Sequence, residues 1–105
     1  MSRFSVVQLI AVCAVLAIGP AIAGGNSDAG REKASQCVSC HGVEGEGVGE
    51  NPPIAGQDPK DFVSVMRAYK TGEIEAPMMA MFVQGLSDED IADLAAYYAS
   101  LSREE

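Results

Sequence analysis

The chain has 105 residues, of which 48% are hydrophobic and only 6% aromatic, and its formal charge is -8. This length accommodates one small domain. The acidic balance excludes a nucleic-acid-binding function, which needs a basic surface to displace counterions, and favours a cationic partner surface instead.

The first 23 residues differ from the rest of the chain. A basic start at Arg3 precedes an apolar run from Val6 to Ile18, and Gly19-Pro20 and Ala21-Ile22-Ala23 follow. This three-part pattern is typical of a secretory signal peptide and predicts cleavage after Ala23. The alternative is an uncleaved membrane anchor, since residues 4–23 are just long enough to span a bilayer. With cleavage, residues 24–105 form a periplasmic domain that has no membrane span.

A short helix is predicted directly after this segment. Asn26, Ser27 and Asp28 are candidate N-caps, and residues 29–36 contain good helix formers apart from Gly30. A glycine inside a helix costs about 1 kcal/mol relative to alanine, and a close helix crossing at Gly30 is one reason to accept that cost.

The predicted helix leads into the string Cys37-Val38-Ser39-Cys40-His41, which is the C-x-x-C-H signature for attachment of a c-type haem. Two thiols one helical turn apart can add to the two vinyl groups of a haem, and the adjacent imidazole then lies next to the iron. The motif therefore predicts one covalently bound haem c, with Cys37, Cys40 and His41 as its binding residues.

Three other uses of these residues stay open. A thioredoxin-like dithiol also uses C-x-x-C, but it lies on a βα pattern that this sequence lacks. A structural zinc site needs four ligands, and two cysteines with one histidine supply three. A disulfide between Cys37 and Cys40 would close so short a loop that it would restrict the unfolded chain little. The corresponding function is that of a haem-free exported dithiol or interaction module.

Three main helices and no strand are predicted, so the fold class is all-α. Residues 42–56 contain five glycines and two prolines and are predicted as a loop. Asp58 caps a second helix that starts at Pro59 and ends at Gly72, and the apolar positions on one face of this helix are Phe62, Val65, Met66 and Tyr69. Ser87 caps the last helix, onto which Leu86 can fold as a hydrophobic staple, and its predicted buried face comprises Ile91, Leu94, Ala95, Tyr98 and Leu101.

Methionines provide candidates for the second axial position of a haem iron. The chain has a single histidine, so a thioether is the natural sixth ligand, and a His/Met pair raises the reduction potential. Met78, Met79 and Met81 lie in a predicted loop between the second and third helices, and their spacing does not choose among them. Met66 belongs to the apolar face of the second helix and is the least expected ligand.

From about Gly30 to Leu101 the sequence resembles the small bacterial class I c-type cytochromes. Besides the C-x-x-C-H motif, residues 52–57 are similar to the loop that leads to the family's second helix, and residues 86–98 are similar to its final helix. The resemblance implies a cytochrome c-like fold wrapped around one haem. It also implies that Met79 is the ligand, because the family's methionine lies eight residues before the serine that caps the final helix. A proline carbonyl accepts a hydrogen bond from the haem-ligating imidazole in this family; Pro52 matches it best and Pro53 is the second choice.

A narrower resemblance covers residues 55–74, which are similar to the cytochrome subunits of flavocytochrome c sulfide dehydrogenases. In those complexes a flavoprotein subunit oxidises sulfide and passes electrons to haem. Two functions therefore stay open: a freestanding electron carrier between partner proteins such as a terminal oxidase, or the haem subunit of a dehydrogenase. In either function, we expect the chain to transfer electrons and not to act as an enzyme itself. The acidic runs Glu44 to Glu50 and Asp88 to Asp93 are candidates for steering basic partners.

Overall fold

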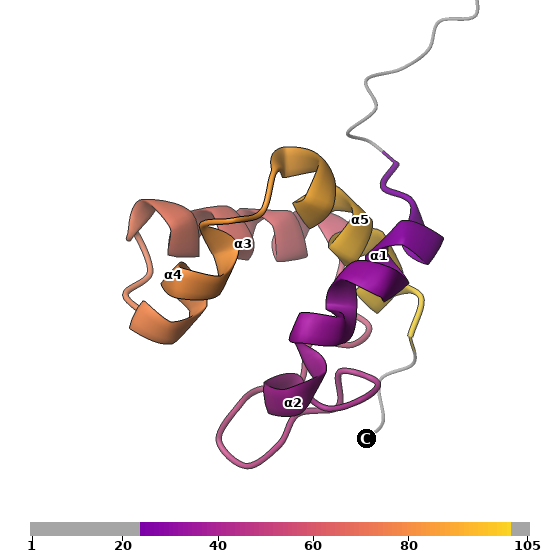
Figure 1. Cartoon of the computed structure of the whole chain (residues 1–105), viewed down its shortest axis with the longest axis horizontal. Coiled ribbons are helices and arrows are strands. Elements are labelled where there is room, and N and C mark those ends of the chain that lie inside the picture. Colours follow the sequence, from indigo (N-terminus) through magenta and orange to yellow (C-terminus); the bar gives the residue numbers. More distant parts are fainter. Residues whose placement is uncertain (1–23, 102–105) are drawn as a thin grey trace, which may run out of the picture.

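The computed structural model describes residues 24–101, which fold mainly into helices. The predicted signal peptide, residues 1–23, lies outside the described residues. The elements follow in the order α1 (Ser27–Lys33), the 3-10 turn η2 (Ala34–Gln36), α2 (Val38–His41), α3 (Pro59–Thr71), α4 (Pro77–Val83) and α5 (Asp88–Ala99). Figure 1 shows α1 lying across α5, α4 next to α3, and the long loop after α2 at the lower end. Between residues 24 and 101, no helix is long and apolar enough to cross a membrane. The predicted all-α class is confirmed.

The crossing of α1 and α5 depends on Gly30. This residue is buried, and a Cβ atom added to it would clash with the main-chain carbonyl of Asp93 and lie 2.8 Å from the Cβ of Tyr97. The close helix crossing predicted at Gly30 is therefore present. Asn26 caps α1, since its side chain accepts a hydrogen bond from the N–H of Ala29 at 2.9 Å.

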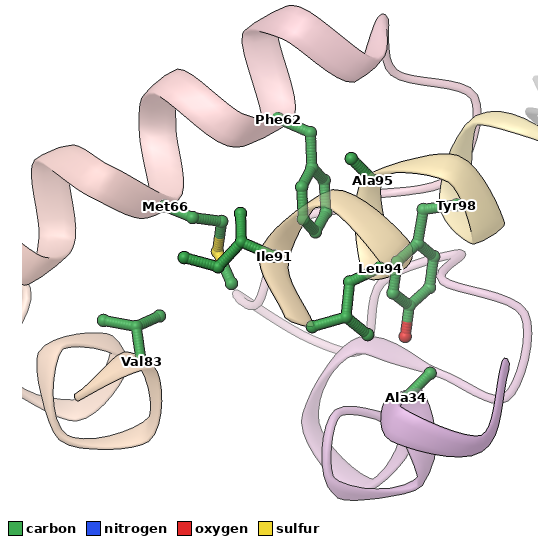
Figure 2. Close-up of a cluster of buried hydrophobic side chains, with 8 residues drawn as sticks. All are labelled: Ala34, Phe62, Met66, Val83, Ile91, Leu94, Ala95 and Tyr98. Atoms are coloured by element: carbon green, nitrogen blue, oxygen red, sulfur yellow. The ribbon is translucent and has the colours of Figure 1, made fainter. Parts of the chain in front are cut away.

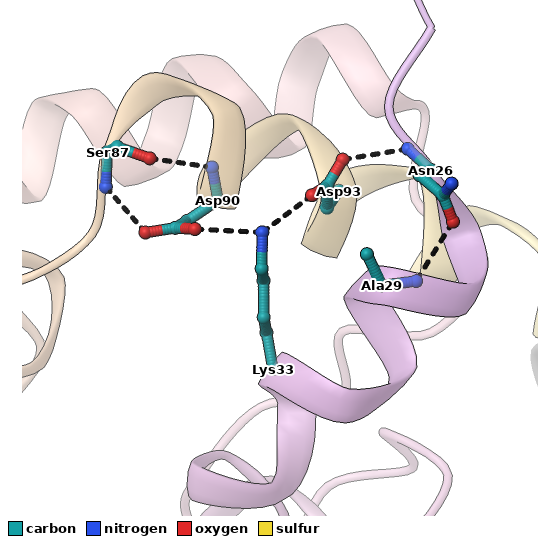
Figure 3. A network of polar contacts seen from close by, with 6 residues as sticks. All are labelled: Asn26, Ala29, Lys33, Ser87, Asp90 and Asp93. Carbon is teal, nitrogen blue, oxygen red and sulfur yellow. Dashed lines mark hydrogen bonds and ion pairs between the residues drawn. The ribbon is translucent and has the colours of Figure 1, made fainter.

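A polar network joins the same two helices (Figure 3). The Nζ of Lys33 on α1 lies 2.6 Å from Asp93 and 2.8 Å from Asp90, both on α5. Asp93 also accepts a hydrogen bond from the main-chain N–H of Asn26 at 2.8 Å. Ser87 and Asp90 form a capping box at the start of α5. The ammonium of Lys33 and the N–H of Ser87 lower the pKa of Asp90 to about 2.

The core lies mainly on α5, whose predicted inner face is buried at four of its five positions. Figure 2 shows Ile91, Leu94, Ala95 and Tyr98 pointing toward α1 and α3. The fifth, Leu101, is partly buried and packs against the same cluster. The rings of Phe62 and Tyr98 stack with their centroids 5.8 Å apart, which ties α3 to α5.

The helix α3 begins and ends where the sequence predicts. Asp58 caps it by accepting a hydrogen bond from the N–H of Lys60, Pro59 is its first residue, and Gly72 ends it in a left-handed conformation with φ of 85°. On its predicted apolar face Phe62 and Met66 are buried, but Val65 is 37% exposed.

The prediction of a loop throughout the segment between the second and third predicted helices is wrong. Residues 77–83 form the helix α4, with a proline in the first turn and no side-chain cap at Ala76. A proline at the start of a helix costs little because the first N–H groups have no intrahelical partner, and methionine and alanine are good helix formers. The segment therefore needs no capping side chain to become helical.

Candidate functional site

The C-x-x-C-H motif forms a single helical turn. The N–H of His41 donates to the main-chain carbonyl of Cys37 at 2.9 Å, so both ends of the motif are joined. Cys37 and Cys40 are partly buried free thiols, and His41 is buried. This turn places both thiols and the imidazole around one hollow.

A hydrogen bond to the main-chain carbonyl of Pro52 orients the imidazole of His41. The Nδ1 of His41 lies 2.8 Å from the carbonyl oxygen of Pro52, and since a carbonyl can only accept, Nδ1 carries the proton and donates. The other ring nitrogen, Nε2, is then unprotonated in the neutral imidazole and keeps the lone pair that a metal ligand needs. Pro53 does not make this contact.

Two neighbouring pockets flank the motif. The larger, about 230 Å³, is walled by cysteine, histidine and methionine residues together with Phe82, Val83 and Leu86. The smaller, about 110 Å³, is bounded by Pro52, Ile54, Phe62, Val65 and Tyr69. Four residues line both pockets: Cys37, His41, Met66 and Met79. The two pockets therefore adjoin at the motif, with thiol, imidazole and thioether groups in a largely apolar wall.

The three methionines of α4 have different positions. Met79 lines both pockets and packs against the core, whereas Met78 lines only the larger pocket and is 63% exposed. Met81 lines neither and is 67% exposed. Met66 also lines both, but its side chain is part of the buried core cluster. Among the three candidates of the helix, Met79 alone shares both pockets with His41.

The exposure of Val65 follows from this arrangement. Val65 lies on the apolar face of α3 but borders the smaller pocket and not the protein core, whereas Tyr69 borders this pocket and also packs against the core cluster. Phe82 lines the larger pocket in a similar way, at 42% exposure, and the sequence reasoning did not single it out. Phe82 lies four residues after Met78, and residues four apart share one face of a helix. A prediction of helix over residues 77–83 would therefore have placed Phe82 beside Met78.

Another hollow, of about 600 Å³, runs along α3 and α5 and includes Lys60, Arg67 and Glu73 in its walls. None of the cysteine, histidine or methionine candidates borders it. Across residues 24–101, no three His, Cys, Asp or Glu side chains converge to hold a metal ion. The cysteine, histidine and methionine side chains therefore gather at the motif and not at this hollow.

A family model described as cytochrome c matches residues 27–102. The chain belongs to the cytochrome c family. It is 44% identical over 80 residues to cytochrome c-554(548) of Halomonas halodenitrificans, a match that covers 72% of this chain and 96% of that protein. It is 26% identical over 84 residues to the cytochrome subunit of sulfide dehydrogenase of Chlorobaculum tepidum, covering 80% of this chain and 76% of that subunit.

A solved structure shares the fold as well. The crystal structure of reduced cytochrome c4 from Pseudomonas stutzeri superposes with a TM-score of 0.71 at 30% identity, covering 77% of this chain and 48% of that one. The cytochrome c fold and membership of the class I monohaem cytochromes are therefore confirmed. Membership also implies one covalently bound haem c, and the residues at the motif fit that group: two free thiols, an imidazole with one nitrogen held by a carbonyl, and an apolar wall with a thioether.

Proposed function

We propose that this cytochrome carries single electrons in the periplasm, with haem attached through Cys37 and Cys40 and its iron bound by His41 and Met79. The observation that carries the proposal is that Met79 and His41 border the same two pockets together with Cys37. With an imidazole and a thioether as its protein ligands, the iron would have no open coordination position for a substrate, which favours electron transfer over catalysis.

The protein's own contribution is to hold these ligands in place. The carbonyl of Pro52 fixes the ring orientation of His41 and raises the basicity of the imidazole by accepting a hydrogen bond from Nδ1. The packing of Met79 against the core cluster restricts the thioether to the pocket side of α4. When bound, the haem supplies one-electron exchange between ferric and ferrous iron. The surrounding wall is largely apolar, and an apolar environment favours the reduced state of the iron.

Residues 1–23 support a periplasmic location, because their pattern is typical of a signal peptide cleaved after Ala23. Covalent haem attachment through a C-x-x-C-H motif is consistent with an exported domain spanning residues 24–105. The domain reaches its partners by diffusion in this proposal, and the acidic surface accelerates encounter with basic partner surfaces such as that of a terminal oxidase.

A second candidate is the haem subunit of a sulfide dehydrogenase complex, in which a flavoprotein subunit is the electron donor. The observation that favours it is the similarity to the cytochrome subunit of sulfide dehydrogenase over 80% of this chain. In that role the chain remains a non-catalytic electron acceptor. Co-purification of a flavin-containing subunit from native extract would support this candidate, and a monomeric native size would contradict it.

The proposal is tested on protein purified from the periplasmic fraction. We expect a mature chain that starts at Gly24 and is heavier by the roughly 600 Da of one haem, together with a one-electron potentiometric titration. We also expect electron transfer to a basic partner to slow as ionic strength rises, because salt screens exposed charges. A two-electron titration, or a mass without haem from cells that contain the attachment machinery, would contradict the proposal.

A further inference from the structure

Tyr98 on α5 carries a buried hydroxyl group without a partner. Its side chain is 1% exposed, and within the part of the chain that the structure describes its Oη is the one buried side-chain nitrogen or oxygen atom that makes no hydrogen bond. Native proteins give most buried polar groups a partner because an unpaired one is costly. The orphaned hydroxyl therefore points to a group that completes the site.

The ring of Tyr98 extends from α5 toward the segment that carries the first cysteine of the motif. In Figure 2 its hydroxyl group, drawn in red, points toward Ala34. Cys37 follows Ala34 by one turn, and its N–H donates to the Ala34 carbonyl at 2.7 Å. The side chain of Cys37 packs against the same core cluster that contains Tyr98. The orphaned hydroxyl and the Cys37 side chain therefore both lie against the turn that follows Ala34, next to the same core cluster.

Neighbouring aromatic rings hold Tyr98 in this orientation. Phe62 stacks on it with ring centroids 5.8 Å apart, and Tyr97 meets it edge-on at 5.0 Å. A Cβ atom on Gly45 would lie 2.9 Å from the ring, so the loop also closes over it. With its ring confined on these sides, the hydroxyl has little freedom to turn away from Cys37.

The two groups also influence each other electrostatically. Burial raises the pKa of the Cys37 thiol, and the nearby Tyr98 hydroxyl partly offsets this rise, as a donor to the thiolate does. Burial likewise raises the pKa of Tyr98, and Cys37 raises it further. The two groups thus affect each other's pKa, although the hydroxyl makes no hydrogen bond with the free thiol.

We propose that the Tyr98 hydroxyl donates a hydrogen bond to the Cys37 sulfur in the haem-bearing protein, and thereby positions the attached haem and raises its reduction potential. The inference rests on the proposed attachment at Cys37. When a thiol adds across a vinyl group, its hydrogen goes to the vinyl carbon, so the thioether sulfur can only accept and Tyr98 has to be the donor. Donation to the sulfur draws electron density away from the macrocycle, which favours the reduced state. Tyr98 is a positioning residue in this scheme.

The test compares the Tyr98→Phe and Tyr97→Phe variants of the haem-bearing protein with the wild type. Tyr97 is a matched control because it is the adjacent tyrosine on the same helix. For Tyr98→Phe we expect the ferric-to-ferrous equilibrium to shift toward the ferric form by up to about fivefold, the equivalent of one neutral hydrogen bond. Tyr97→Phe should leave the potential unchanged. In proton NMR of the reduced wild type, the Tyr98 hydroxyl proton should exchange slowly and show a nuclear Overhauser effect to the Cys37 methylene.

An unchanged potential in Tyr98→Phe would overturn the role of Tyr98. The same conclusion would follow if the hydroxyl proton showed contacts to haem propionate methylenes in place of Cys37. Both results are distinct from a failure of the proposed function. If the wild type and both variants lack the absorption bands and the added mass of haem c, both the proposed function and the role of Tyr98 are wrong.

Discussion

The Nδ1 of His41 donates to the carbonyl oxygen of Pro52 across 2.8 Å, a contact between residues eleven positions apart in the chain. The intervening loop is rich in glycine, and its backbone makes this approach possible. The N–H of Gly47 donates to the His41 carbonyl at 2.7 Å, and the loop returns to α5 where the N–H of Gly56 donates to the main-chain carbonyl of Tyr98 at 2.8 Å. The orientation of the imidazole therefore depends on a loop that has no regular secondary structure.

Gly47 is a residue of this loop at which the backbone leaves no room for a side chain. Its φ is +92°, and an added Cβ would lie 2.9 Å from the nitrogen of Pro53 and 3.0 Å from the carbonyl oxygen of Asn51. We expect Gly47→Ala to lower the free energy of unfolding by about 2–4 kcal/mol, because backbone strain and crowding both act. The Nδ1 proton of His41 should also exchange faster with solvent, which NMR of the variant measures.

Gly49 supplies the control for that prediction. Its φ is +60°, but an added Cβ would have nothing within 4 Å. Gly49→Ala should therefore lower the free energy of unfolding by only about 1 kcal/mol, because the backbone conformation alone is unfavourable for alanine. The exchange of the His41 Nδ1 proton should be unchanged. Equal destabilisation by both substitutions would show that contact with the 51–53 segment is unimportant.

Gly30 makes an equally specific prediction for the crossing of α1 and α5. An added Cβ would collide with the main chain of Asp93, which cannot move without disturbing α5. Gly30→Ala should lower the free energy of unfolding by about 3 kcal/mol in spite of the higher helix propensity of alanine. Gly85→Ala meets no atom within 4 Å and should change stability by less than about 1 kcal/mol. Thermal unfolding of the haem-bearing proteins distinguishes the two substitutions.

Local signals in the sequence predict most of the fold. The caps at Asn26, Asp58 and Ser87 mark the starts of α1, α3 and α5, and Gly72 marks the end of α3. The helix α4 was missed because Ala76 provides no capping side chain. Sequence periodicity cannot reveal such an element when part of its apolar surface faces a pocket and not the protein core.

The same reason limits what the sequence could say about the candidate site. An apolar residue such as Val65 has the periodicity of a core position, yet it borders the pocket and is 37% exposed. The cysteines and His41 are recognisable because a short contiguous motif contains all three. Contacts such as the one between His41 and Pro52 join residues distant in the chain, so spacing and composition leave them undetermined; here a resemblance to a known family pointed to Pro52.

The network around Lys33 makes stability depend on pH. The pKa of Asp90 falls from an ordinary value of 3.8 to about 2, and that of Asp93 is also lowered, first by the N–H of Asn26 and then by Lys33. A lowered pKa in the folded state stabilises the protein above the unfolded-state value, and this contribution is lost as pH falls through the folded-state value. Lys33→Gln should therefore lower the Tm at pH 6, and the difference from the wild type should shrink between about pH 4 and pH 2.

Arg67 provides the matched control for Lys33. It forms an ion pair with Asp88 at 3.5 Å, and both side chains are more than half exposed. Because exposed ion pairs contribute little, Arg67→Gln should leave the Tm nearly unchanged at every pH. If Lys33→Gln behaved in the same way, the contact between α1 and α5 would not depend on the ammonium group.

The assignment of Met79 makes the sharpest prediction about the iron. Met79→Ala should lower the reduction potential, within the range of about 0.8 V over which axial ligands tune haem, and open the iron to carbon monoxide. Met78→Ala and Met81→Ala should have much smaller effects, since these side chains are mostly exposed and border at most one pocket. Potentiometric titration and carbon monoxide difference spectra of the three variants measure this. Equal effects at all three positions, or the largest effect at Met78, would show that the ligand has been assigned to the wrong residue of α4.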